Sequence, residues 1–533
     1  MRTLIKNGLI YDGSGGSPYQ KNILIEGNKI AAVTEDKDLD AENIIDASGL
    51  TVTPGFIDTH RHCDIDALYN PEFGTIEISQ GLTTVIGGNC GLAPVPAPMA
   101  YRKDIFDYIE PCLGIAPEQM SMEYFSEYIK ALEEKELPIQ VGSYIGTGTL
   151  KAAIKGYGKT PFTRAEMEKA KAYIKEGMEA GAVGLSMGIM YQPECYSTRK
   201  EMTELISAAA PYGRPLACHI RGEGNNLVSS VKEIIEITRE AEVPLNISHF
   251  KVTGVKNWGV TIDKAIGLIE EARNKGQDIT VDFYPYCGGS TTLLSLLPPS
   301  VMEDSLVETL KKLSSKSGKE TLIKELYKEH TGWDNMVTAI GWERILISSV
   351  TKESNRKFSG LKFNEAAVIA GYEEPGEFMC DLLIEEQGKV GIILLSMSQE
   401  DVDTVSKLPY SMVISDSLYG VSDCPHPRLY GSFPKIIREY VRERRVLTME
   451  EAIKKMTYFP ANRLSLKGRG RIKEGCYADI NVFDAMNIND YAVYEDPKKL
   501  CSGFKTILVN GKIAVSDDTI ISRINGSVIK IGY

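Results

Sequence analysis

The sequence has little histidine, no long apolar run and no cluster of basic residues. No segment approaches the roughly 20 consecutive apolar residues that a membrane-spanning helix requires. A net charge of −12 without a basic block argues against nucleic acid or an anionic membrane as a partner. The N-terminus has neither an apolar run nor a small-residue cleavage site, which argues against a secretory signal. The ten cysteines are scattered along 533 residues, so we expect reduced thiols and a cytoplasmic protein.

The middle of the chain, residues 55–464, alternates short apolar segments with amphipathic ones. Amphipathic segments such as 164–180 and 227–241 have apolar residues at helical spacing. The apolar segments are predicted as strands: 55–58, 83–86, 140–145, 183–186, 215–219, 244–249, 279–284 and 412–415. Repeated βα units predict a parallel sheet, and eight of them predict an α/β protein with a (β/α)8 TIM-like barrel.

Both ends of the chain have a different pattern, in which short strands are joined by turns. Residues 1–54 and 465–533 contain these predicted strands: 4–11, 23–26, 29–33, 478–483 and 506–509. We therefore predict a small β-sandwich domain built from both termini. Residues 288–387 are too many for a loop, so we predict an inserted subdomain there. Residues 390–396 fit either this subdomain or the barrel.

Four of the six histidines lie at the ends of predicted strands. His60 and His62 follow the first strand, and their i, i+2 spacing puts both imidazoles on one face of an extended segment. His219 and His249 end two later strands. Barrel enzymes carry their catalytic groups at this end of the strands, and neutral imidazoles bind Zn²⁺. We therefore predict a zinc site in preference to four hydrogen-bonded core histidines.

Two further residues at strand ends have side chains that a zinc hydrolase uses. Cys90 lies between glycines after the second strand, and its thiolate would favour zinc over harder cations. The alternative for Cys90 is a small buried apolar residue. Asp416 ends the last strand, where a carboxylate can take a proton from water and deliver it to a leaving amine. The alternative for Asp416 is a helix cap.

These motifs resemble those of the amidohydrolase superfamily and, within it, the N-acyl-D-amino-acid deacylases (D-aminoacylases). The resemblance runs nearly end to end. Its matching segments are 54–62, 88–91, 184–186, 219–223, 248–251, 282–286, 426–428, 456–457 and 475–480. Many superfamily members share the first and last of these segments. Cys90, the residues 284–286 and the His-Pro-Arg of 426–428 are typical of the narrower family.

The resemblance implies a role for each residue of a metal and substrate site. A tight zinc site would use Cys90, His219 and His249. A second, weaker metal position would use His60 and His62, with Cys90 as the bridge in place of the carboxylated lysine of many relatives. Asp416 would be the acid/base. The substrate would be bound by Lys251 and Arg428 at its carboxylate and by pocket residues Tyr191, Tyr284 and Ser290.

Three residues depart from the family pattern and leave the preferred substrate open. Thr147 stands where the family has histidine, Arg61 where threonine is typical, and Cys63 where aspartate is common. The reaction implied by the resemblance is zinc-dependent hydrolysis of an N-acyl-D-amino acid to a carboxylate and a D-amino acid. Two alternatives are a cyclic amide hydrolase of the hydantoinase or dihydroorotase kind and a non-catalytic zinc-holding protein. The number of metals, strict D-stereospecificity and the oligomeric state are left open.

Overall fold

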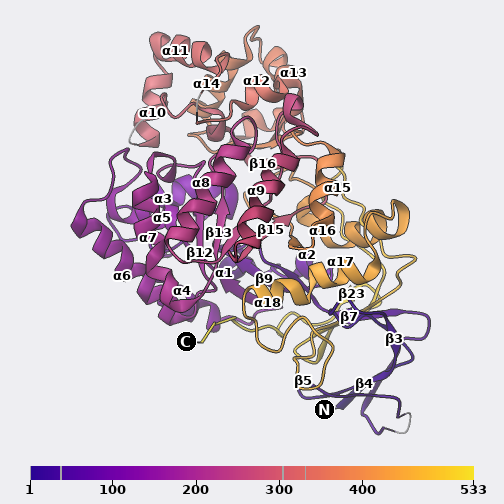
Figure 1. Cartoon of the computed structure of the whole chain (residues 1–533). Helices are drawn as coiled ribbons and strands as arrows, with labels where there is room; N and C mark the ends of the chain where they lie inside the picture. The colour runs from indigo at the N-terminus through magenta and orange to yellow at the C-terminus, as the bar shows by residue number, and fades with distance from the viewer. Residues whose placement is uncertain (1, 37–38, 303–304, 331, 533) are drawn as a thin grey trace.

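The parallel strands of the middle region form a closed barrel, as the sequence predicts (Figure 1). The structure is a computed structural model that describes residues 2–36, 39–302, 305–330 and 332–532. In barrel order the strands are β8 (Phe56–Asp58), β9 (Leu82–Gly87), β10 (Gln140–Ser143) continued by β11 (Ile145–Gly146), β12 (Leu185–Gly188), β13 (Leu216–His219), β14 (Leu245–Ile247), β15 (Ile279–Phe283) and β19 (Ser411–Val413).

The barrel closes where the chain leaves β8 and β19. The amide of Asp416 donates to the carbonyl of His60 at 2.9 Å, and the amide of His62 donates to the carbonyl of Ser417 at 3.0 Å. Arg61 and Ser417 form a parallel bridge between the same two segments. Closure therefore puts the predicted metal histidines directly beside the predicted acid/base.

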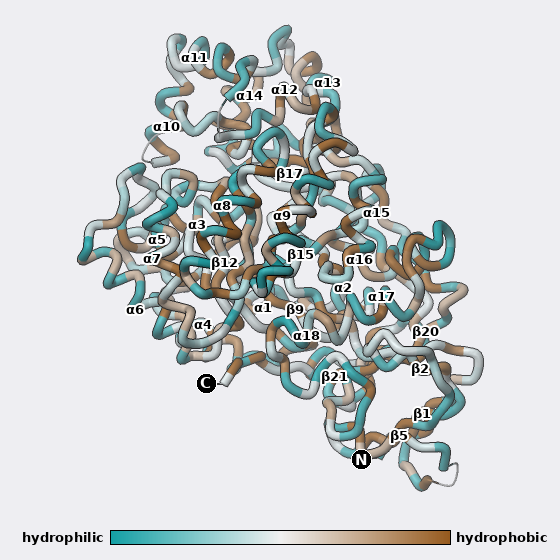
Figure 2. Tube along the Cα trace, in the orientation of Figure 1, coloured by the Kyte–Doolittle hydropathy of each residue, from teal (hydrophilic) through white to brown (hydrophobic). Residues whose placement is uncertain are grey.

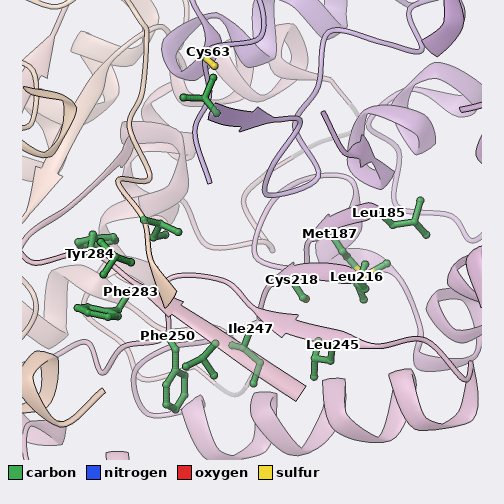
Figure 3. Close-up of a cluster of buried hydrophobic side chains, with 14 of the residues drawn as sticks. Cys63, Leu185, Met187, Leu216, Cys218, Leu245, Ile247, Phe250, Phe283 and Tyr284 are labelled. Atoms are coloured by element: carbon green, nitrogen blue, oxygen red, sulfur yellow. The ribbon is translucent and has the colours of Figure 1, made fainter. Parts of the chain in front are cut away.

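Helices surround the barrel and bury one face of each strand. Leu216, Leu245 and Ile247 lie in one apolar core with residues of the surrounding helices (Figure 3). Apolar residues gather around the strands in the middle of the molecule (Figure 2). The outer helices are α3 (Arg102–Leu113), α4 (Phe125–Glu133), α5 (Thr147–Lys155), α6 (Arg164–Ala180), α7 (Arg199–Ile206), α8 (Leu227–Glu240), α9 (Ile262–Asn274), α15 (Gln399–Lys407), α16 (Arg428–Lys435), α17 (Met449–Met456) and α18 (Tyr458–Arg463). No helix in the described part of the chain has the length and apolar character to cross a membrane.

Helix α6 shows how local sequence sets these boundaries. Its N-terminus is a capping box, in which the Thr163 hydroxyl accepts from the Glu166 amide at 3.3 Å and the Glu166 carboxylate accepts from the Thr163 amide at 2.7 Å. It ends at Gly181, which adopts the left-handed conformation with φ of +106°. These two signals explain why the predicted and observed helix agree.

The two ends of the chain form two sheets that pack together. One sheet has the order β5-β4-β1-β6 and the other β23-β22-β21-β20-β7-β2-β3. Their bounds are β1 (Arg2–Lys6), β2 (Leu9–Ile10), β3 (Tyr19–Gln20), β4 (Asn22–Glu26), β5 (Lys29–Thr34), β6 (Asn43–Asp46), β7 (Thr51–Pro54), β20 (Ile480–Phe483), β21 (Phe504–Val509), β22 (Lys512–Ser516) and β23 (Thr519–Ile520). The prediction of one strand over 4–11 is wrong, because Asn7 turns the chain with φ of +66° and sends β1 and β2 into different sheets.

Between β15 and β19 the chain forms a separate lobe, drawn at the top of Figure 1. Its sheet is antiparallel, with the order β16-β18-β17. Residues 390–396 therefore belong to this lobe and not to the barrel. The bounds are β16 (Gly289–Thr292), β17 (Ile345–Ser349), β18 (Gly391–Leu394), α10 (Leu306–Leu313), α11 (Lys316–Leu326), α12 (Met336–Ile340), α13 (Phe363–Ile369) and α14 (Pro375–Glu385). This inserted lobe has an apolar core of its own, distinct from the core around the barrel.

Phe56 joins the barrel to the terminal sheet, and its removal tests that junction. Its fully buried ring lies 5.9 Å from Phe433, 6.3 Å from Phe483 and 6.5 Å from Phe504. We expect Phe56→Ala to lower the free energy of unfolding by about 3–5 kcal/mol, because it leaves a cavity in this cluster. Denaturant unfolding followed by circular dichroism measures the change.

The matched control is Met486→Ala, at a residue that is 72% exposed. We expect it to change the free energy of unfolding by no more than about 0.5 kcal/mol. A similarly small effect for Phe56→Ala would show that the ring cluster does not stabilise the junction.

Candidate metal centre and active site

Four buried side chains converge at the barrel rim. The ligand atoms of His60, Cys90, His249 and Asp416 all lie within 4.8 Å of one another. Cys90 Sγ is 3.2 Å from His60 Nε2 and 3.6 Å from His249 Nε2. Asp416 Oδ1 is 3.2 Å from His60 Nε2. The donor set of imidazole, thiol and carboxylate is one that zinc uses in proteins.

A second set shares His249 with the first. The ligand atoms of His219, Glu223 and His249 also lie within 4.8 Å of one another, and the rings of His219 and His249 are 4.3 Å apart. His62 belongs to neither set, but its Nε2 lies 3.4 Å from Asp416 Oδ1. All five predicted metal ligands therefore lie in one region of the rim, with His249 between the two sets.

The state of the imidazoles fits a metal ion. Both ring nitrogens of His219 are buried and have no hydrogen-bond partner among the described residues, and the same holds for Nδ1 of His60 and of His62. Burial holds the pKa of His219 and of His249 well below the ordinary histidine value, so both rings are neutral and keep a lone pair. Burial also raises the pKa of the Cys90 thiol, so a thiolate there requires a cation beside it.

The backbone is strained at three of these positions. Cys90, His249 and Asp416 have φ of +54°, +37° and +51°, a region that residues with a Cβ rarely adopt. The loop of Cys90 comes so close to its neighbours that a Cβ on Gly88 would lie 2.3 Å from the Tyr144 carbonyl oxygen. Such strain collects at functional sites, where the surrounding structure holds side chains in a required position.

Asp416 is held as a carboxylate. Burial alone would raise its pKa, but Arg428 and His60 hold the pKa well below the usual aspartate range. Arg428 Nη1 lies 2.8 Å from Asp416 Oδ2, while Oδ1 faces the histidines. Asp416 is therefore ionised at neutral pH and can accept a proton on Oδ1.

Lys251 is held by an acidic residue that the sequence analysis does not assign. Lys251 Nζ donates to Glu223 Oε1 at 2.6 Å and lies 2.7 Å from His249 Nδ1, and Glu223 Oε1 is 2.9 Å from the same His249 nitrogen. Glu223 lies within segment 219–223, one of the segments that carry the family resemblance, and this is the sequence feature that could have indicated it. It offsets the charge of Lys251 and orients the His249 ring.

The predicted substrate residues line one cavity with the metal cluster. The cavity has a volume of about 70 Å³. Tyr191, Tyr284 and Ser290 line it together with Lys251, Arg428 and every predicted ligand except His60, which is 3.2 Å from Cys90. The Arg428 guanidinium lies 4.7 Å from the centre of the Tyr284 ring. The cavity also has walls that the sequence analysis missed, formed by Met190, Trp333, Asp334 and Leu394.

The departure at Thr147 is accommodated behind the cavity. The Thr147 hydroxyl donates to Glu194 Oε1 at 2.5 Å, and its Oγ1 lies 2.9 Å from the Ser186 carbonyl oxygen. Burial raises the pKa of Glu194 to about 7. Thr147 is therefore a structural contact of the rim and not part of the cavity wall. Cys63 is buried in the barrel core.

The departure at Arg61 creates a buried network between the two strand ends that close the barrel. Arg61 is fully buried. Its Nη1 lies 3.3 Å from Asp58 Oδ2 and its Nη2 3.2 Å from Glu77 Oε1. It also donates to the Tyr419 hydroxyl at 2.5 Å and to the Ser415 hydroxyl at 3.1 Å. Arg61 therefore ties the segment that carries His60 and His62 to the segment that carries Asp416.

Buried imidazoles, a thiol and an ionised aspartate at the carboxyl ends of barrel strands define a metal-dependent hydrolase. Two family models, each described as "Amidohydrolase family", match the chain: one matches residues 51–286 and the other residues 414–515. The chain is 31% identical to the D-aminoacylase of Alcaligenes xylosoxydans xylosoxydans over 508 residues, which are 95% of this chain and 93% of that protein. It is 30% identical to the N-acyl-D-glutamate deacylase of the same organism, over 95% of this chain and 92% of that protein.

A solved structure agrees with these relatives. The N-acyl-D-glutamate deacylase from Bordetella bronchiseptica, complexed with zinc and a phosphonate inhibitor that mimics the tetrahedral intermediate, superposes with a TM-score of 0.84. It is 28% identical and covers 99% of both chains. The chain belongs to the D-aminoacylase family of the amidohydrolases.

Replacement of Arg61 tests the buried network. We expect Arg61→Met to lower the free energy of unfolding by about 3–5 kcal/mol, because Asp58 and Glu77 would remain as buried charges without their cation. Denaturant unfolding measures this. The control is Arg356→Met, at a half-exposed arginine 3.1 Å from Glu353, where a loss below about 1 kcal/mol is expected. Equal losses for both variants would contradict the network.

Proposed function

We propose that the protein is a zinc-dependent hydrolase that cleaves the amide bond of N-acyl-D-amino acids, releasing a carboxylate and a D-amino acid. One observation carries the proposal: a single cavity holds a zinc-type donor set, an ionised Asp416 and the two cations Lys251 and Arg428. A hydrolase of acylated amino acids needs all three, for the water, the proton and the substrate carboxylate. Membership of the D-aminoacylase family supports it.

The metal would be held by Cys90, His219, His249, His60 and His62. Zinc bound there supplies an activated water and polarises the acyl carbonyl. Asp416 takes the proton of the attacking water on Oδ1, the oxygen that faces the histidines. It then donates the same proton to the nitrogen of the leaving amino acid, which restores the carboxylate. Arg428, 2.8 Å from Oδ2, keeps Asp416 oriented during both transfers.

Lys251 and Arg428 bind the substrate carboxylate in this proposal. Lys251 is hydrogen-bonded to Glu223, and Arg428 forms an ion pair with Asp416, so each is held in place before the substrate arrives. A carboxylate that contacts both cations directs the amide toward the metal cluster, and the α-carbon then points its side chain in one direction only. This is how the cavity would distinguish the two enantiomers of the amino acid.

A cytoplasmic location is proposed with the function. All ten cysteines are free thiols. This supports the reducing compartment that the sequence predicts.

A substrate screen with metal analysis separates the alternatives. The panel contains N-acetyl-D- and L-amino acids together with hydantoins and dihydroorotate, and zinc is measured on the same protein. We expect bound zinc and turnover of the D-compounds. Turnover of cyclic amides only would overturn the substrate class, and bound zinc without any turnover would favour the non-catalytic alternative.

Asp416→Asn tests the proton transfer. Asparagine keeps the size of the side chain but cannot take the proton, so we expect kcat to fall by about 10²- to 10⁴-fold. Zinc content should match the unsubstituted protein. The control is Asp423→Asn, at a half-exposed residue of the same segment. Loss of zinc together with activity would make Asp416 a metal ligand and not a proton carrier.

Lys251→Met tests carboxylate recognition. Loss of one charge-assisted hydrogen bond should lower kcat/KM roughly ten- to hundredfold, mainly through KM. An N-acetyl amine without a carboxylate should be hydrolysed equally by both proteins, however slowly. Lys256→Met, at an exposed lysine nearby, is the matched control. A similar loss with the amine would mean that Lys251 acts through His249 and not through the substrate.

A further inference from the structure

A second cavity adjoins the active site. It has a volume of about 240 Å³, against about 70 Å³ for the catalytic cavity. A single water requires only roughly 10–15 Å³ on this scale. Met190, Tyr191 and Trp333 line both cavities, so they form the shared boundary. The second cavity lies between barrel helices α3 and α5 and the part of the inserted lobe around α10.

The wall of the second cavity is largely apolar. The inserted lobe contributes Leu294, Leu297, Met302 and Leu306, and the barrel contributes two tyrosines, Tyr108 and Tyr157, whose ring centroids are 4.5 Å apart. Such a surface favours an apolar ligand, because its burial removes apolar area from water on both sides.

The charged residues of this cavity are already neutralised or exposed. Lys103 pairs with Asp107 at 2.5 Å, and Lys155 pairs with Glu166 at 3.2 Å. Asp104 is exposed. Among the described residues that line the cavity, each of the two lysines thus has an acidic partner.

The boundary lies next to the metal cluster. The Tyr191 ring is 4.9 Å from the His219 ring, and its hydroxyl is 3.3 Å from the Thr291 hydroxyl. Lys251 and Arg428 also line the catalytic cavity. The catalytic cavity itself leaves little free volume for a substrate held there by its carboxylate, and the larger second cavity adjoins it at Tyr191.

We propose that the second cavity binds an extended apolar chain of the substrate, carried either by the acyl group or by the side chain of the D-amino acid. This rests on the proposed deacylase function and names its substrate class: N-acyl-D-amino acids with a long apolar substituent. Each methylene that enters the cavity should improve kcat/KM roughly three- to fourfold.

Two substrate series tell the two sources of the chain apart. The first is N-acetyl-, N-hexanoyl- and N-decanoyl-D-alanine. The second is the N-acetyl derivatives of D-alanine, D-norleucine and D-2-aminodecanoic acid. We expect kcat/KM to rise with length in one series, and that series identifies the group that enters the cavity.

A cavity-filling variant assigns the gain to this site. Ser295 is a half-buried wall residue whose hydroxyl donates to the Thr292 carbonyl at 2.7 Å. We expect Ser295→Phe to lower kcat/KM for the long substrate at least tenfold and to leave N-acetyl-D-alanine unchanged. Ser314→Phe is the matched control, because Ser314 is exposed, lies in the same lobe and donates to the Lys311 carbonyl at 2.7 Å.

A second variant keeps the proposal testable if Ser295→Phe does not fold. Val307 is 73% exposed at the cavity rim, so Val307→Glu should fold normally and still oppose an apolar chain. It should also lower kcat/KM for the long substrate selectively.

The possible failures are distinct. Hydrolysis of no N-acyl-D-amino acid would overturn the deacylase function, and this proposal with it. Hydrolysis of N-acetyl-D-alanine with no gain along either series would overturn the cavity proposal alone. So would an equal loss on short and long substrates in Ser295→Phe and Val307→Glu.

Discussion

The hydrogen bond from the Asp416 amide to the His60 carbonyl joins the first and last strands of the barrel, and the active site depends on it. Residues that are more than 350 positions apart in the chain become neighbours through this bond. Cys90, His219 and His249 lie at or just after the ends of strands that lie between these two in the barrel order, so their positions follow from closure. The geometry of the proposed metal cluster therefore depends on the backbone geometry of the barrel.

Paired charges hold the site in place around that closure. Asp416 is matched by Arg428, Lys251 by Glu223, and the acids Asp58 and Glu77 by Arg61. Each pair is largely buried, where an unpaired charge would be costly. The consequence is a site whose polar groups are oriented before a substrate enters, which is the electrostatic arrangement that catalysis uses.

Much of the barrel and rim can be predicted from the sequence because the signals are local. Short apolar strands and capped helices such as α6 are encoded within their own segments, and histidine or aspartate at a strand end predicts a place at the rim. The partners of those residues are set by long-range packing. Glu223 reaches Lys251 from another strand end, and Trp333 reaches the cavity from the inserted lobe.

Other differences also have long-range causes. The prediction of one strand over 4–11 overlooks the turn signal Asn7-Gly8, and the division of this segment follows from the pairing of β1 and β2 with different sheets. Residues 390–396 are as apolar as a barrel strand, and only their antiparallel pairing with β16 and β17 places them in the inserted lobe. Periodicity alone does not separate these cases.

The inserted lobe has its own apolar core, yet it supplies walls of the catalytic cavity. The proposed metal ligands and Asp416 therefore belong to the barrel, whereas several residues of the cavity wall belong to the inserted lobe. Mutations in the lobe can reshape what the enzyme accepts while the barrel rim keeps its geometry. Because the lobe and the barrel rim are separate, substitutions in the lobe can change substrate selectivity without replacing a proposed catalytic residue. The lobe is therefore the place to redesign selectivity.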